Sequence, residues 1–490
     1  MIFTNTSFIN RVVSDAASKA ISTPELISHE ILNFRTSKKF RQMLDGVRYY
    51  EGNHDILQKR RTTIGESGKK EAVDNLPNSR QIDNQYRKMV KQKTNYLVGK
   101  PLSVQTDHEQ YQAALTPFFG KKFMRQLKNV TKDSLNCGIG WLHPYYNDQG
   151  EFCLKRFRPF ELIPGWADVD HTQLEYAIRF YDVEVYNGKR EDTLTKVEFY
   201  TLDGVEYFEY HNGVLIPCAP YHQNSFCIGN AAYNWQRLPF IPFKYNDEEL
   251  PLIVNCKSLQ DGLNTIVSNF QDNMEEDMRN TILILVNYDG QNLGEFRRNL
   301  STYGAVKVRN DSQGAGGDVK ALQVEVNSEN YKAIISIFKK AIVENCMGYD
   351  AKDEKLSGTP NQMNIQSMYN DIDLDASDME TEYQAALEEL LWFVNMHLIN
   401  TGAGNFDNET VEFVFNTDMP MDESATIQNI QNSEGIISDE TLVANHPWVT
   451  DPEKELERLK KQQEENLDGF GFTPQSPNKP GGDPVNGEEE

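Results

Sequence analysis

Apolar residues near the N-terminus recur every three or four positions, which is the spacing of one helix face. One such pattern runs from Leu26 to Val47 and stops before Gly52, and a second runs from Ile82 to Leu97. The second ends at Gly99-Lys100-Pro101, and glycine just past a helix followed by proline is a stop signal. The pattern therefore predicts helices, joined by a loop rich in Gly, Lys and Arg, after a polar and flexible arm over residues 1–23.

Residues 138–245 change to a period of two. Apolar and polar side chains alternate, as at Tyr176, Ile178 and Phe180, and turn signals such as Asn187-Gly188 separate the runs. Residues 197–200 and 207–213 add a further strand and a hairpin. We expect an antiparallel, β-rich block here.

Residues 251–349 show a helix, a small module and a second helix. An apolar stripe from Leu259 to Met278 predicts a helix over 258–280, about 35 Å long at 1.5 Å per residue, and a stripe from Tyr331 to Ile342 predicts its return. Residues 282–328 between them have strand-like runs at 282–286, 305–308 and 322–326 around a glycine-rich turn. We interpret the segment as a helical hairpin with an α/β module at its tip.

The C-terminal part begins with a polar loop over residues 350–362. A long helix follows, with its stripe from Tyr383 to Leu398, and residues 371–390 within it contain eight acids and no base. A strand at 411–415, two short helices and a last helix complete the pattern; Asp451-Pro452 predicts the start of that last helix. Residues 466–490 are rich in Pro, Gly, Asn and Glu and predict a disordered acidic tail.

Composition narrows the class of protein. No run of the 490 residues approaches the ~18 apolar residues of a membrane span, and the N-terminus lacks the basic start and apolar run of a secretory signal. The six cysteines form no CxxC pair, so we expect reduced, buried thiols of a cytoplasmic protein.

Charge is distributed unevenly. The net charge is −24, yet residues 1–100 hold 18 basic and 10 acidic side chains. The negative total argues against a protein that simply wraps nucleic acid. The asymmetry favours self-association or a polyanion near one part only, and a solvated surface without a partner is the alternative.

Motifs for catalysis or for cofactors are not evident. Gly65-Glu66-Ser67-Gly68-Lys69-Lys70 lacks the GxxxxGK[ST] spacing, and no apolar strand leads into it. There is no GxSxG, and the nine histidines form no cluster. We therefore predict no catalytic residue, no cofactor and no metal.

One acidic motif has the ligand spacing of a calcium loop. Asp371, Asp373 and Asp375 alternate, and Glu382 is at the twelfth position. However, Ala376 stands where the sharp turn needs glycine. We prefer an acidic lead-in to a helix, whose first turns favour carboxylates.

Four segments, in this order, resemble the portal protein family of tailed bacteriophages in its SPP1-type branch. The segments are Tyr96-Leu97-Val98-Gly99-Lys100-Pro101 with the helix before it, residues 140–164, residues 238–264, and residues 435–453. Together they extend over residues 40–465. The loop departs from the family's Gly-x-x-Ser-Gly-rich stretch, because it reads Leu356-Ser357-Gly358-Thr359-Pro360-Asn361.

The resemblance implies an α+β portal fold that assembles as a dodecameric ring at one capsid vertex. DNA would enter through its central tunnel during packaging and leave through it at ejection. The implied divisions are an arm (1–23), a wing (24–250), a first stem helix (251–281), a clip (282–328), a second stem helix (329–349), a tunnel loop (350–362), a long wing helix with a strand (363–420), a crown (421–465) and the tail (466–490).

The resemblance also suggests site residues. A basic tunnel would grip DNA, which carries about one charge per 1.7 Å of axis, whereas an acidic wall lets it slide. The candidate wall residues are Asp371, Asp373 and Asp375. The candidate DNA-facing residues of the tunnel loop are Lys352, Lys355, Ser357, Thr359, Asn361 and Gln362. The candidate docking residues of the clip are Arg297, Arg298, Lys307 and Arg309. A solvated surface is the alternative for the loop and clip sets.

The implied partners are further copies of the chain, double-stranded DNA bound without sequence specificity, the terminase large subunit, a head–tail adaptor, and the major capsid and scaffolding proteins. The protein would be a non-enzymatic component of the virion, present in host cytoplasm during assembly. Three other functions stay open: another head–tail connector, a metal-dependent nuclease using the three alternating aspartates, and an acidic scaffold that binds only protein.

Overall fold

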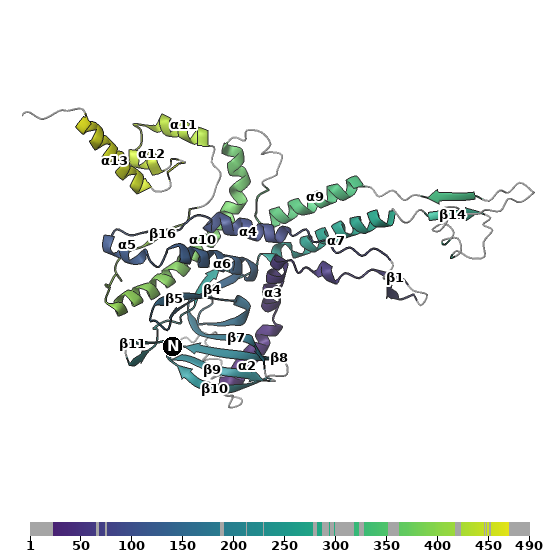
Figure 1. The fold of residues 1–490 in the computed structure, drawn as a ribbon, viewed down its shortest axis with the longest axis horizontal. Helices are drawn as coiled ribbons and strands as arrows, with labels where there is room; N and C mark the ends of the chain where they lie inside the picture. The colour runs from purple at the N-terminus through teal and green to yellow at the C-terminus, as the bar shows by residue number, and fades with distance from the viewer. Residues whose placement is uncertain are drawn as a thin grey trace, which may run out of the picture. The chain divides into compact units, whose positions relative to one another are not determined.

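The computed structural model consists of two compact units (Figure 1). Unit 1 contains residues 1–351 and 368–418, and unit 2 contains residues 352–367 and 419–490. The structure describes residues 23–64, 68–73, 76–186, 191–211, 213–228, 230–277, 282–286, 294, 298, 318–322, 328–350, 362–416, 423–444, 446, 448–449 and 452–469. Among these, no helix is long and apolar enough to cross a membrane.

Three helices form the N-terminal part of unit 1: α2 (Thr23–Thr36), α3 (Lys38–Glu51) and α4 (Gln85–Val98). The pattern that we read as continuous from Leu26 to Val47 is two helices. The Ser37 hydroxyl accepts the Phe40 N–H at 3.0 Å and so caps α3. Gly52 ends α3 with a φ of 98°, a left-handed conformation that glycine tolerates.

The segment between α3 and α4 contains η1 (Asp55–Gln58) and a short hairpin of β1 (Thr62–Ile64) and β2 (Lys70–Ala72). The predicted stop of α4 is confirmed, since the helix ends at Val98. Gly99 is right-handed there, so Pro101 rather than a left-handed cap prevents continuation.

The β-rich block is confirmed as antiparallel. The larger sheet has the order β10-β9-β8-β7-β6, built from β6 (Leu162–Trp166), β7 (Leu174–Tyr186), β8 (Glu191–Thr201), β9 (Gly204–His211) and β10 (Val214–Gln223). In the second sheet, β4 (Ile139–Tyr146) lies between β5 (Phe152–Phe157) and β13 (Ile241–Lys244). The remaining elements are η2 (Pro159–Glu161), β11 (Phe226–Ile228) and β12 (Ala231–Tyr233). The predicted turn at Asn187-Gly188 lies outside the described residues.

The core joins the helices to this block. Ile27 and Ile31 of α2 pack on the large sheet, against Ile178 and Phe208 among others. Behind the second sheet lies α6 (Lys121–Cys137), preceded by α5 (Glu109–Leu115). At Gly46 α3 crosses α6 so closely that a Cβ atom would lie 1.9 Å from the Asn136 carbonyl oxygen. Only glycine fits this crossing.

The predicted helical hairpin is confirmed, with shifted bounds. Its helices are α7 (Ile253–Asp277) and α9 (Ser328–Asn345). Between them in the chain, β14 (Ile282–Val286) pairs antiparallel with β15 (Asp318–Leu322). The strand predicted at 305–308 lies outside the described residues, and of the one predicted at 322–326 only Leu322, the last residue of β15, is described.

The long helix is α10 (Gln362–Thr401), and the strand after it, β16 (Glu412–Val414), pairs with β3 (Ser103–Gln105). Unit 2 contains α11 (Glu423–Ser433), α12 (Asp439–Ala444) and α13 (Pro452–Gly469). Pro452 is the first residue of α13, as predicted. The predicted boundary of the tail at 466 is wrong, because the helix continues to Gly469.

The cysteine prediction was only half right. All six thiols are free, but only Cys137, Cys256 and Cys346 are buried. Cys227 is exposed and the other two are half-buried, because they lie on sheet strands with one open face.

Candidate functional site

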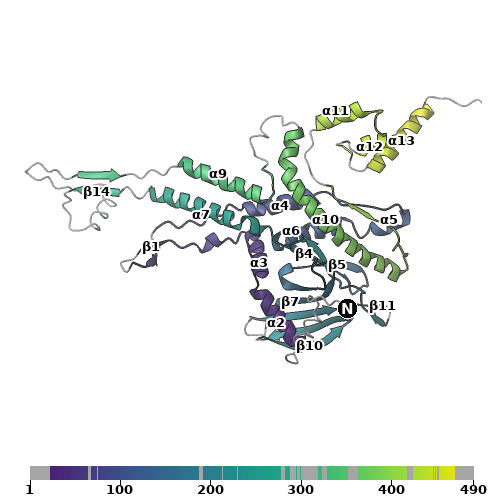
Figure 2. The same ribbon diagram turned by 180° about the vertical axis from the view of Figure 1, so that it is seen from behind.

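The helical hairpin is the most distinctive feature of unit 1. In Figures 1 and 2, α7 and α9 lie side by side and lead to β14 and β15. The 25 residues of α7 span about 38 Å. At Gly262 the helices approach so closely that a Cβ atom would lie 2.5 Å from the Phe338 ring. The hairpin is therefore a closely packed rod.

One face of α7 is polar although it is buried. Gln260, Asn264, Ser268 and Asp272 follow each other at intervals of four, and none is more than 2% exposed. Their side chains accept backbone N–H groups of a distant segment: Asp272 from Ser79 at 2.6 Å, Ser268 from Gln81 at 2.9 Å, Asn264 from Asp83 at 3.1 Å, and Gln260 from Gln85 and Tyr86 at 3.0 Å.

The spacing of the side chains on α7 matches the spacing of the backbone N–H groups on the segment. Four helical residues rise about 6 Å and two extended residues about 6.6 Å, so the register holds over the whole contact. Buried backbone groups need partners, and here helix side chains supply what a neighbouring strand would supply in a sheet. We call this contact the α7 zipper. The prediction from the sequence followed only the apolar stripe; polar residues at every fourth position beside it were the overlooked signal.

Ion pairs hold both ends of the zipper. Asp272 lies 2.9 Å from the Lys59 ammonium and 3.8 Å from the Arg61 guanidinium. Burial opposes the charge of Asp272, but hydrogen bonds from Lys59 and Ser79 outweigh it and lower its pKa. Towards the start of α7, Lys257 lies 2.6 Å from Asp55.

The outer side of the hairpin leaves apolar side chains uncovered. Met274 of α7 and Ile334 and Ile337 of α9 are 45%, 40% and 64% exposed. We call these three residues the open hairpin face. Exposed apolar side chains on both helices of such a rod are candidates for an interface.

The long helix α10 corrects part of the acidic-wall prediction. Asp371 is exposed, but Asp373 accepts the Tyr96 hydroxyl at 2.8 Å. Asp375 is 8% exposed; it lies 2.6 Å from the Lys93 ammonium and accepts the Tyr245 hydroxyl at 2.7 Å. The prediction is therefore wrong for Asp375, which is the partner of a buried cation. Since burial disfavours an isolated charge, it lowers the pKa of Lys93 and makes the pairing necessary.

The same geometry argues against metal chemistry at these aspartates. They lie on a helix, where positions two apart point in different directions, and two of them are already bound to protein groups. Across the residues that the structure describes, no group of three His, Cys, Asp or Glu side chains could hold a metal ion.

Helix α4 contacts the chain before and after the predicted tunnel loop. The Gln92 amide donates to the Tyr349 carbonyl at 2.8 Å and accepts the Tyr349 N–H at 3.2 Å. On the other side of the loop, α4 contacts α10 through the Lys93–Asp375 pair. The Tyr349 and Tyr369 rings lie 4.2 Å apart between these contacts. Tyr349 before the loop and the stretch of α10 from Tyr369 to Asp375 after it therefore lie against the same helix.

Most of the predicted contact residues lie outside the part of the chain that the structure describes. Lys352, Lys355, Ser357, Thr359 and Asn361 lie outside the described residues, and Gln362 is the first residue of α10. Of the clip set, Arg298 is helical and exposed, whereas Arg297, Lys307 and Arg309 lie outside the described residues.

Solved structures that the chain is similar to include chains of gene transfer agent particles. A chain in the neck of an empty particle matches with a TM-score of 0.39 and 12% identity, over 82% of this chain and 92% of that one. A chain in the native virion matches with a TM-score of 0.37 and 13% identity, over 73% and 88%.

Sequence relatives are more informative. The portal protein of Bacillus phage SPP1 is 28% identical over 466 residues, which are 94% of this chain and 90% of the relative. The portal protein of Clostridium phage phiCD119 is 25% identical over 429 residues, or 85% and 91%. The family model "Phage portal protein, SPP1 Gp6-like" matches residues 33–468. The resemblance seen in the four sequence segments is thus confirmed, and the chain belongs to the SPP1 Gp6-like family of phage portal proteins.

Proposed function

We propose that this portal chain assembles with copies of itself, most simply twelve, into a ring at one capsid vertex, and that double-stranded DNA passes through the ring. The observation that carries the proposal is the open hairpin face on a rod about 38 Å long. The 79–86 segment covers one side of α7 and α9 another, but Met274, Ile334 and Ile337 stay exposed, so a neighbouring hairpin would cover them.

The tunnel loop is the proposed DNA contact. The position of the loop favours this role, because α4 contacts the chain before the loop through Gln92 and after it through the Lys93–Asp375 pair. Lys352 and Lys355 remain the proposed phosphate contacts, with Ser357, Thr359, Asn361 and Gln362 beside them. Of the three proposed acidic-wall residues, Asp371 is exposed and is proposed to repel DNA, so that DNA slides past it.

The segment between α7 and α9 is the proposed docking region. Arg298 is exposed there, and Arg297, Lys307 and Arg309 would join it in binding the terminase large subunit and later a head–tail adaptor. The capsid and scaffolding proteins are proposed to surround the ring, which would form in host cytoplasm and stay in the virion. The family has a structural role, and we propose that ATP hydrolysis resides in the motor.

Electron microscopy of the purified protein, paired with light-scattering mass, tests the ring. We expect rings with a central hole and a mass near twelve times 56.2 kDa. A chain that stays monomeric at high concentration, alone and with its capsid and scaffolding proteins, would refute the proposal.

A further inference from the structure

Positive charge also gathers on α4 and on α6, which lies beyond the basic residues 1–100. Residues 85–132 contain ten basic and two acidic side chains, in a chain whose net charge is −24. The structure describes this range without a gap. Lys93 pairs with Asp375 and Lys88 lies 3.7 Å from Asp350, but neither the ring nor the tunnel loop accounts for the other eight.

Four of these cations form a line along α6. Lys121, Arg125, Lys128 and Lys132 are spaced by four, three and four residues, which places them on one helix face. Lys121 and Arg125 are exposed and the other two are half-buried. We call these four residues the α6 stripe; it is about 16 Å long.

Contacts in the C-terminal half of the α6 stripe place it beside α4 and β5. The Lys128 ammonium donates to the Gly99 carbonyl at 3.2 Å, which places the stripe beside the end of α4. Next to this contact, Arg156 of β5 donates to the Asn129 carbonyl at 3.3 Å and lies 3.2 Å from Asp133. Burial raises the pKa of Asp133 to about 7, so its carboxylate cancels only part of the positive charge.

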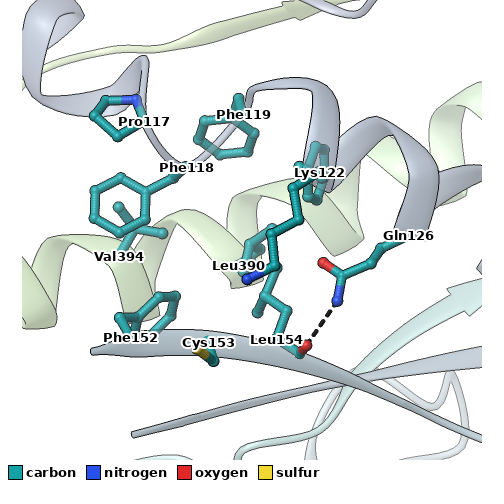
Figure 3. Close-up of a pocket in the computed structure, with 11 residues that line it drawn as sticks. Pro117, Phe118, Phe119, Lys122, Gln126, Phe152, Cys153, Leu154, Leu390 and Val394 are labelled. Atoms are coloured by element: carbon teal, nitrogen blue, oxygen red, sulfur yellow. Dashed lines mark hydrogen bonds between the residues drawn. The ribbon is translucent and has the colours of Figure 1, made fainter. Parts of the chain in front are cut away.

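The helix that carries the stripe is rigidly held. Its opposite face is buried through Phe123, Leu127 and Val130. A cavity of about 130 Å³ near its start is lined mainly by apolar side chains of α6, β5 and α10 (Figure 3). Gln126 closes one side by donating to the Leu154 carbonyl at 2.7 Å. Lys122 lines this cavity, and we leave it out of the stripe.

The chemistry of the stripe favours a polyanion over a protein. Among the described residues, no carboxylate forms an ion pair with Lys121, Arg125 or Lys132, and no large apolar side chain between residues 85 and 132 is exposed. Protein interfaces have an apolar centre, which is missing here. A DNA duplex presents about ten phosphates over 16 Å of axis, enough for every cation of the stripe.

We propose that the α6 stripe binds the phosphate backbone of double-stranded DNA, without sequence specificity and outside the channel. This contact goes beyond the proposed function, because a closed ring could hold DNA on its body as well as in its tunnel. It would engage DNA that has already passed through the ring or lies against it.

Covalently closed circular DNA tests the proposal, because it cannot thread through a closed ring. We would measure binding of the full chain to a relaxed circular plasmid and to the same plasmid linearised, across a series of salt concentrations. The test variant is Lys121→Gln/Arg125→Gln/Lys132→Gln, which keeps Lys128 because of its structural hydrogen bond. The matched control is Lys38→Gln/Lys460→Gln/Lys461→Gln, which removes three exposed cations that belong to neither the stripe nor the hairpin.

We expect the wild type and the control to bind circular DNA equally. Three lost phosphate contacts should lower the slope of log K against log salt by about 2.7 and weaken binding at least about tenfold. If the triple variant loses the ring, Arg125→Gln alone should lower the slope by about 0.9.

Three results would overturn the inference: binding of linear DNA only, equal binding by test and control variants, or loss of self-association in the test variant with unchanged DNA binding. The last result would make the stripe a subunit contact. Circular-DNA binding by a chain that never forms rings would refute the ring and leave this inference standing.

Discussion

The α7 zipper can be broken at one side chain, Gln260. It is fully buried, accepts the N–H groups of Gln85 and Tyr86, and donates to the Asp83 carbonyl at 2.7 Å. Gln260→Met keeps the length of the side chain and removes its hydrogen-bonding groups. Three backbone groups then lose their partners in a place that water does not reach.

The magnitude follows from these three groups. Each buried polar group without a partner costs about 1–3 kcal/mol, so the segment should be loosened by about 3 kcal/mol or more. That is roughly a hundredfold in a local opening equilibrium, which hydrogen exchange measures directly.

The assay is hydrogen exchange with mass spectrometry on peptides that cover residues 77–88. The matched control is Thr265→Val on the same helix, because the Thr265 hydroxyl is exposed and bonds only to the Asp261 carbonyl of α7 itself. We expect faster exchange in the peptides of Gln260→Met and unchanged exchange in the control. Equal exchange in both variants would show that α7 side chains do not hold the segment.

Three further predictions concern other contacts. Lys93→Met should destabilise the protein by about 3–5 kcal/mol, because Asp375 loses its buried cation, and adding Asp375→Leu should recover most of it in urea unfolding; equal loss in both variants would contradict the pairing. Burial lowers the pKa of His143 from 6.5 to about 4. Between these pH values the unfolded chain carries this proton and the folded chain does not. The free energy of unfolding should therefore be highest above pH 6.5 and fall by up to about 3 kcal/mol as the pH drops to 4. The urea midpoint of His143→Gln should fall less than that of the wild type between pH 6.5 and 4. An unchanged pH dependence in the variant would exclude His143 as the cause. Ile337→Asp should prevent ring assembly without changing the circular dichroism of the subunit, whereas Val169→Asp, at a residue 79% exposed, should not; rings of unchanged mass in the first variant would exclude the open hairpin face as the interface.

The sequence alone determined the long helices α4, α7, α9 and α10, the antiparallel strand block and the family, but not α5 and α6. The stripes that end at Leu97 and Leu398, the alternation around Ile178 and the proline of α13 are local signals, because helix and strand periods act over a few residues. The family segments are also read locally. The hairpin α7–α9 could therefore be predicted with small shifts in its bounds.

Only the tertiary structure decided which polar residues are buried. Asp375 looked like an exposed acid because an acidic helix pattern does not reveal a cation at Lys93, far away in the chain. The polar face of α7 likewise has no local meaning without the backbone of residues 79–86. The spacing of the cations on α6 could be read from the sequence as one helix face. Their lack of carboxylate partners, however, depends on what the fold packs around α6. Polar groups take their role from the partners that folding brings to them, and burial makes those partners obligatory.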